Sequence, residues 1–546
     1  MTMISTEGDT RSTVELLRQG RREEIWRKYC GFLDLTLPEF MEIQESLLLE
    51  QIERLKRCEL GNHLLRGQSP KSVEEFRRVV PLTKYDVYEP YLSQKREDVL
   101  PEKPLSWART SGRSEEYAMK WVPVSAEFYQ RSVEYLLAML MLSSSHGKGD
   151  FSLEEGDRIL YGLAPAPYAS GQIPYGLVRE FPFRFLPPVE VAEKMSFQER
   201  IEEGFRLALS EGLDFFAGIA SVLVAVGERF EGGLEGTKTP GLSRRPAVVG
   251  RVLRGLLRSR LNGRQMLPRD LWSLKGIGTG GMDTDILRGQ IRRYWGRYPI
   301  EIYAATELGT IAVQTWDYEG MTFFPDMSFL EFIPEEEHLR SKDEPSYQPS
   351  TVLLDEVEAG QKYEIVGTNL KGGIFVRYRV GDMIEITARR NARLEIDLPQ
   401  MCFYSRCDDI IDIAGFTRLT EKILWTALAD SRVPFLDWAA SKEVEGERSF
   451  LHLYIETKDN TLSHALVKER LHTTLELLDS DYRHLEELLG LDPLRVTLLS
   501  PGTFERYLRD REAAGADFAH LKPPHIVSSE EVLQRLLKMS SHGLAF

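Results

Sequence analysis

The sequence lacks the residue patterns that metal centres and disulfide scaffolds usually require. It has four cysteines in 546 residues, and no two of them form a C-x-x-C pair, which disfavours zinc ribbons and redox dithiols. Scattered thiols are typical of a reducing compartment, so we expect a cytoplasmic protein. The ten histidines form no H-E-x-x-H pattern, and a zinc hydrolase is therefore not indicated.

Long hydrophobic runs and an excess of basic residues are also missing. The most apolar stretch, 215–226, is too short to cross a bilayer and predicts a buried helix. Residues 1–29 are polar and charged, without the apolar segment of a secretory signal. The net charge is −15, so the basic surface typical of nucleic-acid binding does not dominate. We therefore expect neither nucleic acid nor stable membrane insertion.

The chain is too long for one hydrophobic core, so at least two domains are expected. Alternating strands and helices up to residue 303 predict an α/β domain with parallel strands. Short β runs over 321–390, with a hairpin turn at Gly372-Gly373, predict an antiparallel β subdomain. We place a large N-terminal domain at 1–404 and a small, mobile α+β C-terminal domain at 405–546.

The local patterns also predict individual elements. Ser125 is a suitable N-cap for the helix that follows it. Helices are predicted over 12–60, 126–141, 196–230, 247–261, 285–295 and 463–478, and strands over 120–124, 158–163, 273–281, 299–303, 328–333, 363–368, 374–379, 383–387, 450–456 and 494–499.

The first chemically informative segment is Tyr303-Ala304-Ala305-Thr306-Glu307. It follows a predicted strand, and α/β sheets bind ligands at the carboxyl ends of their strands. The Thr306 hydroxyl can donate to a phosphate, and the Glu307 carboxylate suits Mg²⁺. The alternative is an ordinary helix start with Thr306 as its N-cap.

Two later segments carry acids beside basic residues. Arg377-Tyr378-Arg379-Val380-Gly381-Asp382 predicts a tight turn between two strands, with Asp382 able to accept both hydroxyls of a ribose. The alternative is a charged hairpin tip. Ser405-Arg406-Cys407-Asp408-Asp409 lies at the predicted domain boundary and suits a ribose or phosphate contact and a hinge. The alternative is a solvated linker.

Two further segments offer groups for phosphates. The small residues of Thr110-Ser111-Gly112-Arg113-Ser114, followed by Lys120, predict a loop whose N–H groups and hydroxyls bind phosphate oxygens. No Walker motif is present, and the alternative is a surface turn. Lys522 stands before two prolines that stiffen its segment, and its ammonium suits developing negative charge. The alternative is an exposed loop lysine.

In this order and spacing, the segments resemble the nucleotide-binding motifs of adenylate-forming enzymes, the superfamily of acyl-CoA synthetases, adenylation domains and luciferases. Within it the chain is most similar to the GH3 family of acyl acid–amido synthetases. The similarity extends from about residue 40 to the end. The segments on which this similarity rests are Pro81-Leu82-Thr83-Lys84-Tyr85, Arg379-Val380-Gly381-Asp382, the run 352–366, Pro501-Gly502-Thr503-Phe504, Gly515-Ala516 and Lys522-Pro523-Pro524.

The resemblance implies roles by position and an adenylate-forming enzyme fold. Asp408 matches the hinge between domains, and Lys522 matches the lysine that serves adenylation. The phosphate loop is matched by Thr110, Ser111, Gly112 and Ser114, the adenine site by Gly280, Gly281 and Tyr303, the phosphate and Mg²⁺ pair by Thr306 and Glu307, and the ribose site by Asp382 and Arg406.

The implied reaction has two steps. A carboxylic acid attacks ATP, with Mg²⁺ as the metal, to give an acyl-adenylate and pyrophosphate. An amine, expected to be an amino acid, then displaces AMP to form an amide. ATP is expected to bind in the crevice between the two domains, and the protein is expected to be a monomer or a dimer.

Two departures from the family pattern keep other functions open. Glu115-Glu116 places two acids where the phosphate loop normally continues with glycines, which supports a degenerate, non-catalytic binding protein as one alternative. The segment Ala414-Gly415-Phe416 is more similar to the sequence of the wider superfamily than to that of the plant GH3 proteins. This supports an acyl-CoA ligase as the second alternative.

Two apolar features have less specific interpretations. An aromatic set is interpreted as core, with an acyl pocket as the alternative. It consists of Tyr168, Tyr175, Phe181, Phe183 and Phe185. The predicted helix 247–261 carries arginines on one face and Val249, Leu253, Leu256 and Leu257 on the other. Its basic face is interpreted as solvated, with contact to a membrane or to CoA phosphates as the alternative.

Overall fold

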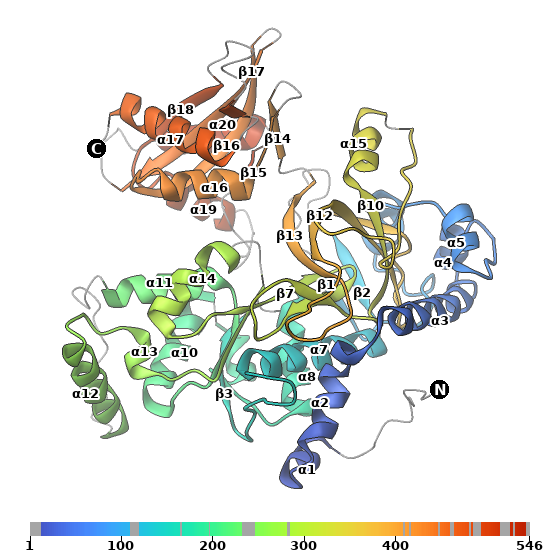
Figure 1. Cartoon of the computed structure of the whole chain (residues 1–546), viewed down its shortest axis with the longest axis horizontal. Helices are drawn as coiled ribbons and strands as arrows, with labels where there is room; N and C mark the ends of the chain where they lie inside the picture. The colour runs from blue at the N-terminus through green and yellow to red at the C-terminus, as the bar shows by residue number, and fades with distance from the viewer. Residues whose placement is uncertain are drawn as a thin grey trace. The chain divides into compact units, whose positions relative to one another are not determined.

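The computed structural model describes residues 12–109, 120–163, 166–195, 197–231, 246–280, 284–344, 346–407, 410–413, 417–445, 448–458, 463–479, 482–483, 493–513, 525–527 and 530–541. The chain divides into two compact units (Figure 1). The first consists of Met1–Val380 and Glu385–Phe403, and the second of Gly381–Ile384 and Tyr404–Phe546.

The first unit begins with helices, as the sequence predicts for 12–60. Capping boxes start two of them, Ser12 with Glu15 and Thr36 with Glu39. Gly20, at φ 71°, separates the first two. The helices are α1 (Thr13–Arg18), α2 (Arg22–Cys30), the 3-10 turn η1 (Gly31–Asp34), α3 (Leu37–Leu55), α4 (Glu59–Leu64), α5 (Val73–Val79), the 3-10 turn η2 (Tyr85–Val87) and α6 (Glu89–Leu92).

An eleven-stranded sheet forms the framework of the first unit, and it joins the predicted α/β and antiparallel regions. The strand order is β10-β11-β12-β13-β9-β8-β7-β6-β5-β3-β4. The parallel part contains β3 (Arg158–Gly162), β4 (Arg184–Leu186), β5 (Phe215–Gly218), β6 (Gly276–Gly280) and β7 (Ile300–Ala305). The remaining strands are β8 (Gly309–Gln314), β9 (Met321–Phe323), β10 (Ser328–Pro334), β11 (Lys362–Asn369), β12 (Tyr378–Ala388) and β13 (Gln400–Arg406).

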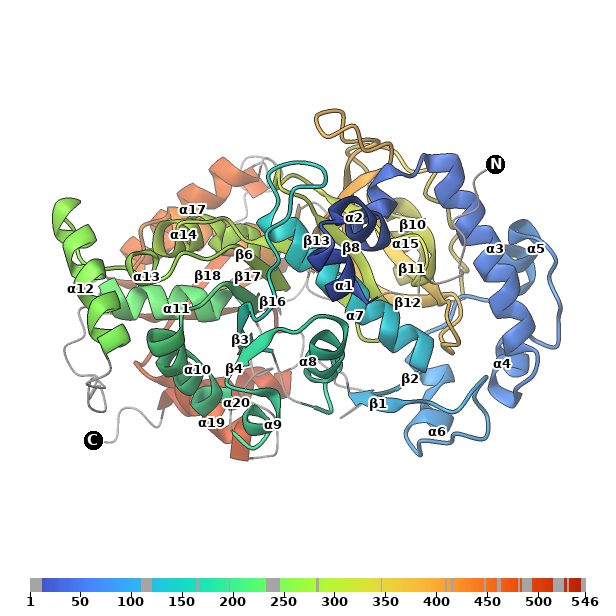
Figure 2. The same ribbon diagram turned by 90° about the horizontal axis from the view of Figure 1, so that it is seen from below.

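Helices cover both faces of the parallel strands (Figure 2). Leu160, Phe216 and Ile277 pack with helices α10 (Phe197–Glu211), α11 (Ala220–Glu231) and α14 (Thr284–Trp295). On the other face, Gly276 and Gly278 admit Ser143 and Met139 of α7 (Ala126–Ser144), because any Cβ would overlap them. The other elements are α8 (Ala169–Glu180), α9 (Val189–Ala192), α12 (Pro246–Leu261), α13 (Pro268–Leu271), α15 (Glu335–Asp343), β1 (Ser106–Arg109) and β2 (Trp121–Val124).

The second unit is α+β, as predicted. Strand β17 pairs antiparallel with β16 and parallel with β18, and Trp438, Ile455 and Leu471 lie in a core packed between this sheet and its helices. The elements are β14 (Ile410–Ile413), β15 (Thr417–Thr420), α16 (Glu421–Asp430), β16 (Phe435–Glu445), β17 (Arg448–Thr457), α17 (His464–Leu478), β18 (Leu494–Leu499), α19 (Thr503–Ala513) and α20 (Glu530–Ser541).

Three local predictions were wrong. Phe215–Gly218 is a strand within the predicted helix 196–230, because a strand buried on both faces shows no alternation that distinguishes it from a buried helix. Gly381, at φ 81°, lies within β12 and does not turn between two strands. The run 374–379 is not a strand until Tyr378. The predicted cap Ser125 is confirmed, since its side chain accepts from the Phe128 N–H.

No helix of the described residues is both long enough and apolar enough to cross a bilayer.

Candidate functional site

The turn after β7 carries the two residues that the sequence assigns to phosphate and metal. Thr306 and Glu307 join β7 to the antiparallel strand β8, so the alternative of a helix start is wrong. Strands β6 and β7 are parallel, and Gly280 pairs with Ile302. Gly280 and Thr306 therefore lie at the carboxyl edge of the parallel strands, where open α/β sheets bind their ligands.

Two side chains hold Glu307 in place. The Tyr378 hydroxyl donates to Glu307 Oε1 at 3.1 Å, and the Asn369 side-chain amide donates to the Glu307 carbonyl at 2.8 Å. Burial, and then the Glu307 carboxylate, raise the pKa of Tyr378, so the phenol stays protonated and acts as the donor. Sequence reasoning assigned neither partner this role, although Tyr378 belongs to a motif that it singled out.

The segment Pro81–Tyr85 fixes Tyr378 from the other side. Thr83 forms a short parallel bridge with Tyr378, in which its N–H donates to the Arg377 carbonyl and its carbonyl accepts from the Arg379 N–H, both at 2.9 Å. The Tyr85 hydroxyl accepts from the Trp121 N–H at 2.8 Å. Two motifs that are far apart in the sequence thus form one support for Glu307.

The two arginines of the motif 377–382 are engaged by buried acids. Arg377 pairs with Glu331 at 2.7 Å, and their side chains are 6% and 0% exposed. Arg379 pairs with Glu364 at 2.6 Å, and His338 Nδ1 lies 2.6 Å from the same carboxylate. Although burial opposes it, hydrogen bonds from His338 and Arg379 lower the pKa of Glu364. These arginines therefore support the fold, and the charged-hairpin alternative is wrong.

Asp382 and Arg406 form a pair within the second unit. The Arg406 Nε donates to Asp382 Oδ1 at 3.2 Å, and Asp382 is buried. The Cys407 N–H donates to the Gly381 carbonyl at 2.8 Å and fixes the backbone beside the acid. The sequence assigned both residues to one ribose site, and the structure places their side chains in contact.

The aromatic residues fall into two groups. Tyr303 is buried and its ring lies 6.2 Å from that of Phe403, a residue that sequence reasoning missed. Phe181 and Phe183 are buried with ring centroids 4.8 Å apart, and Phe183 packs on Phe215. This second group supports the interpretation as core.

Several predicted site residues lie outside the described part of the chain. They are Thr110, Ser111, Gly112, Ser114, Gly281, Asp408 and Lys522. Arg109, directly before the predicted phosphate loop, is a residue that the sequence did not single out. Its Nη2 donates to the Tyr168 hydroxyl at 2.7 Å, and its buried Nε has no hydrogen-bond partner among the described residues. At the other end of the loop, the Lys120 ammonium lies 5.3 Å from the centre of the Tyr85 ring.

His525, three residues after Lys522 in the sequence, is anchored in the second unit. Its Nδ1 lies 2.6 Å from Glu421 Oε1 and its Nε2 lies 3.1 Å from Asp437 Oδ1. The imidazole stacks on the Trp438 ring, with 4.4 Å between ring centroids. The backbone carbonyl of His525 accepts from the Ala440 N–H at 2.6 Å. The chain is therefore fixed to β16 at His525, three residues after the predicted catalytic lysine.

The charge of His525 should make stability depend on pH. Burial opposes the charge, but Asp437 and Glu421 outweigh it and raise the pKa of His525 to about 9. The ordinary value is about 6.5, so the stabilisation is complete below that pH and disappears as the pH rises through 9. From about pH 7 to pH 10, urea denaturation should show the wild-type unfolding free energy falling on the order of 2 kcal/mol more than that of His525→Gln.

His452 is the matched control for this prediction. It also contacts a carboxylate, Glu443, and stacks on Tyr454, but burial lowers its pKa. His452→Gln should keep the wild-type slope. Equal slopes for wild type and His525→Gln would contradict a charged His525.

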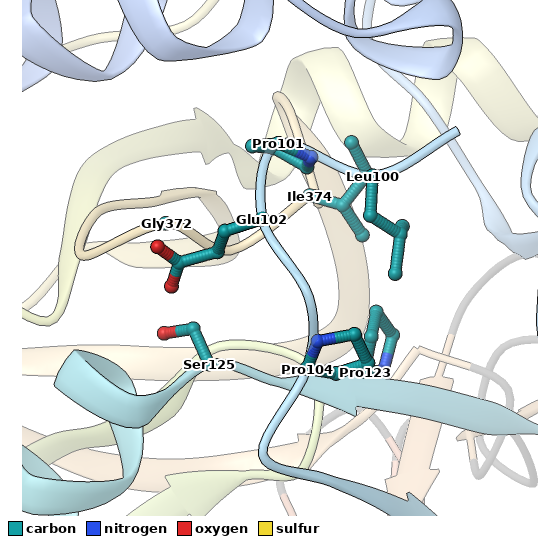
Figure 3. A pocket seen from close by; sticks show the side chains of 8 residues that line it. All are labelled: Leu100, Pro101, Glu102, Pro104, Pro123, Ser125, Gly372 and Ile374. Carbon is teal, nitrogen blue, oxygen red and sulfur yellow. The ribbon is translucent and has the colours of Figure 1, made fainter. Parts of the chain in front are cut away.

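A small hollow beside the turn at Gly372 is too small for a substrate. It lies between the segment that carries Glu102 and the end of β2 (Figure 3). Its volume of about 10 Å³ leaves room for about one water molecule. Gly372, at φ 80°, would bring any Cβ to 2.5 Å from Glu102. The positive φ, which side chains with a Cβ rarely adopt, explains the glycine at the predicted turn.

Three sequence models of the GH3 family match the chain. The N-terminal domain of the family matches residues 31–184, the central domain 321–406 and the C-terminal domain 425–531. Together these matches cover more than half of the chain.

Each of two individual relatives matches this chain over less than half of its own length. A jasmonoyl–L-amino acid synthetase GH3.5 of Oryza sativa subsp. japonica is 27% identical over 281 residues, which are 48% of this chain and 47% of the relative. An indole-3-acetic acid-amido synthetase GH3.3 of Arabidopsis thaliana is 26% identical over 227 residues, 39% of this chain and 36% of the relative. The chain thus spans less than half of the length of these curated relatives.

Solved structures show the fold. The AtGH3.15 acyl acid amido synthetase in complex with 2,4-DB matches with a TM-score of 0.68 and 18% identity, over 95% of this chain and 96% of that one. A 2-hydroxyisobutyryl-CoA ligase matches with a TM-score of 0.59 and 15% identity, over 93% and 94%. The predicted adenylate-forming enzyme fold is thereby confirmed.

Proposed function

Because this chain belongs to the GH3 family, we propose that it is an ATP-dependent ligase that joins a carboxylic acid to an amino acid. In the first step the acid carboxylate attacks the α-phosphorus of ATP, pyrophosphate leaves, and an acyl-adenylate forms. In the second step the amino group attacks the acyl carbon, AMP leaves, and the amine loses a proton to give an amide.

The observation that carries this proposal is the fixed position of Glu307 at the carboxyl edge of the parallel strands. Tyr378 and Asn369 orient its side chain and backbone. Thr306 precedes it in the same turn, where its hydroxyl can donate to a phosphate oxygen. A hydroxyl and a carboxylate at this edge suit a nucleoside triphosphate, because its phosphates need a hydrogen-bond donor and its Mg²⁺ needs an oxygen ligand.

The Glu307 carboxylate suits a Mg²⁺ ion that is bound together with ATP. This ion usually keeps several waters and takes one or two carboxylates together with substrate phosphates, and Glu307 supplies one half-buried carboxylate. When bound, the ion offsets negative charge on the phosphates. The task of this chain is to orient that carboxylate, which Tyr378 does through its hydroxyl.

We assign Asp382 to the ribose hydroxyls, with Arg406 holding its carboxylate. Asp382→Asn keeps the shape of the side chain but removes the charge that strengthens these hydrogen bonds, so we expect the dissociation constant of ATP to rise by about 10-fold. Isothermal titration calorimetry measures this constant directly. Asp397→Asn, an exposed acid of the same chain, is the control, and unchanged ATP affinity in Asp382→Asn would contradict the ribose role.

Which acceptor takes the acyl group is decided by a screen. Pyrophosphate release is measured with a panel of carboxylic acids and hydroxylamine, then with pooled amino acids and with CoA. Acid-dependent release stimulated by amino acids supports the amide ligase. Stimulation by CoA alone would replace it with the acyl-CoA ligase that Gly415-Phe416 leaves open, and neither release nor stabilisation by ATP would indicate a non-catalytic protein.

We also place the reaction in the cytoplasm. All four cysteines are thiols without a disulfide, in keeping with a reducing compartment.

A further inference from the structure

One stretch of this acidic chain carries only basic charges. Between Glu235 and Asp270 the sequence holds nine lysines and arginines and no acid, although the whole chain has a net charge of −15. Helix α12 occupies the centre of this stretch. It lies at the outer margin of the first unit in both views (Figures 1 and 2). Such a local reversal of charge indicates a partner of negative charge.

The inner face of α12 is packed against the unit. Val248, Gly255 and Ser259 are buried. A Cβ on Gly255 would come within 2.8 Å of Leu271, so the glycine allows α12 to approach α13 closely. Arg251 Nη1 donates to the Ala208 carbonyl of α10 at 3.1 Å. The helix is thus held in a defined orientation.

The outer face of α12 is apolar and exposed. At 100° per residue, these side chains span roughly 140° of the helix surface, opposite the buried face. Five of the eleven large apolar side chains that are exposed in the described part of the chain belong to this one stripe. They are Val249 (40%), Leu253 (55%), Leu256 (38%), Leu257 (62%) and Leu261 (85%).

Exposed arginines border this stripe. Arg254 and Arg258 follow one flank, and Arg260 lies near its C-terminal end. An apolar stripe with cations beside it is the pattern of a helix that lies in the interface of an anionic membrane, where leucines enter the acyl region and guanidinium groups reach the headgroups. In an antiparallel contact with a second copy of α12, Arg254 and Arg258 of both helices would lie on the same flank, and like charges oppose that contact.

We propose that α12 is a membrane-surface anchor whose partner is an anionic lipid bilayer, with the helix lying in the plane of the headgroups. The exposed arginines of α12 select the lipid, and the leucine stripe supplies the buried apolar area. This anchor is separate from the residues assigned to ligation, and it stands whether or not the ligase proposal holds.

The test is co-sedimentation of the full-length protein with vesicles. Vesicles of phosphatidylglycerol mixed with phosphatidylcholine are compared with vesicles of phosphatidylcholine alone, at low and high ionic strength. We expect binding to the anionic vesicles, loss of that binding at high ionic strength, and little binding to the zwitterionic ones. Equal binding to both lipids, or binding to neither, would overturn the proposal.

Paired variants separate the two contributions. Leu253→Ser with Leu257→Ser should weaken vesicle binding by at least 10-fold, and Arg254→Gln with Arg258→Gln on the order of 10-fold. Leu477→Ser with Leu478→Ser, which alters exposed leucines on α17, is the matched control and should bind as wild type. Wild-type binding by the α12 variants would contradict the assignment to this helix.

Two further measurements distinguish lipid binding from misfolding and from self-association. Circular dichroism and acid-dependent pyrophosphate release should be unchanged in the α12 variants, since the helix is outside the proposed site. Sedimentation velocity measures the oligomeric state. A dimer that dissociates in Leu253→Ser with Leu257→Ser, without vesicle binding in the wild type, would show a second copy as the partner and overturn the lipid proposal.

Discussion

Lys522→Ala should lower acid-dependent ATP–pyrophosphate exchange by at least about 100-fold. This is the usual cost of removing one preorganised group that meets developing charge in a transition state. The exchange assay reports adenylation alone, so it isolates the step that the lysine is proposed to serve. Because the ammonium acts on the transition state more than on bound ATP, the loss should fall mainly on the rate constant and little on the KM for ATP.

The controls for Lys522 are another lysine of the second unit and the anchored His525. Lys442 is exposed on β16 of the same unit, and Lys442→Ala should exchange as wild type. His525→Gln is the intermediate variant. It keeps Lys522 but weakens the contacts that hold His525 to Glu421 and Asp437. We expect a smaller loss of exchange there. Normal exchange in Lys522→Ala would remove the lysine from the mechanism.

Glu307→Gln should lower the exchange rate by about 100-fold and raise the Mg²⁺ concentration needed for half-maximal rate. The amide keeps the volume of the side chain and can still accept from Tyr378, but it lacks the charge that binds a hard cation. Titration of Mg²⁺ at fixed ATP measures both effects in one experiment. The metal requirement distinguishes a ligand from a residue that only supports the turn.

Tyr378→Phe provides the intermediate case for Glu307. It removes the hydroxyl that orients the carboxylate while leaving the ring packed against Phe375 and Tyr88. We expect about a 10-fold loss with the same shift in metal requirement, as is typical when an outer partner of a ligand is removed. Glu319→Gln, at an exposed position, should leave both quantities unchanged. An unaltered Mg²⁺ dependence in Glu307→Gln would exclude it as a ligand.

Much of the fold could be predicted from local patterns. The periodicity of apolar residues and the capping residue Ser125 predicted the helix that follows it, and apolar runs predicted the strands β3 and β18. These predictions succeeded because the residues that give each signal lie close together in the sequence. Local patterns failed for β5, whose Phe215–Gly218 is buried on both faces and carries no alternation. They failed also at Gly381, because a glycine with positive φ suits a turn and a distorted strand equally well.

By itself, the sequence determined the family resemblance, the identity of the candidate groups and the basic stretch between Glu235 and Asp270, since each is a matter of residue type and order. Only the tertiary structure decided that Tyr378 and Asn369 hold Glu307, and that Arg377 and Arg379 are engaged by buried acids. It also decided that the leucines of α12 face outward. The reason is physical: a side chain's partner is set by the residues that folding brings beside it, and these come from strands and helices far away in the chain.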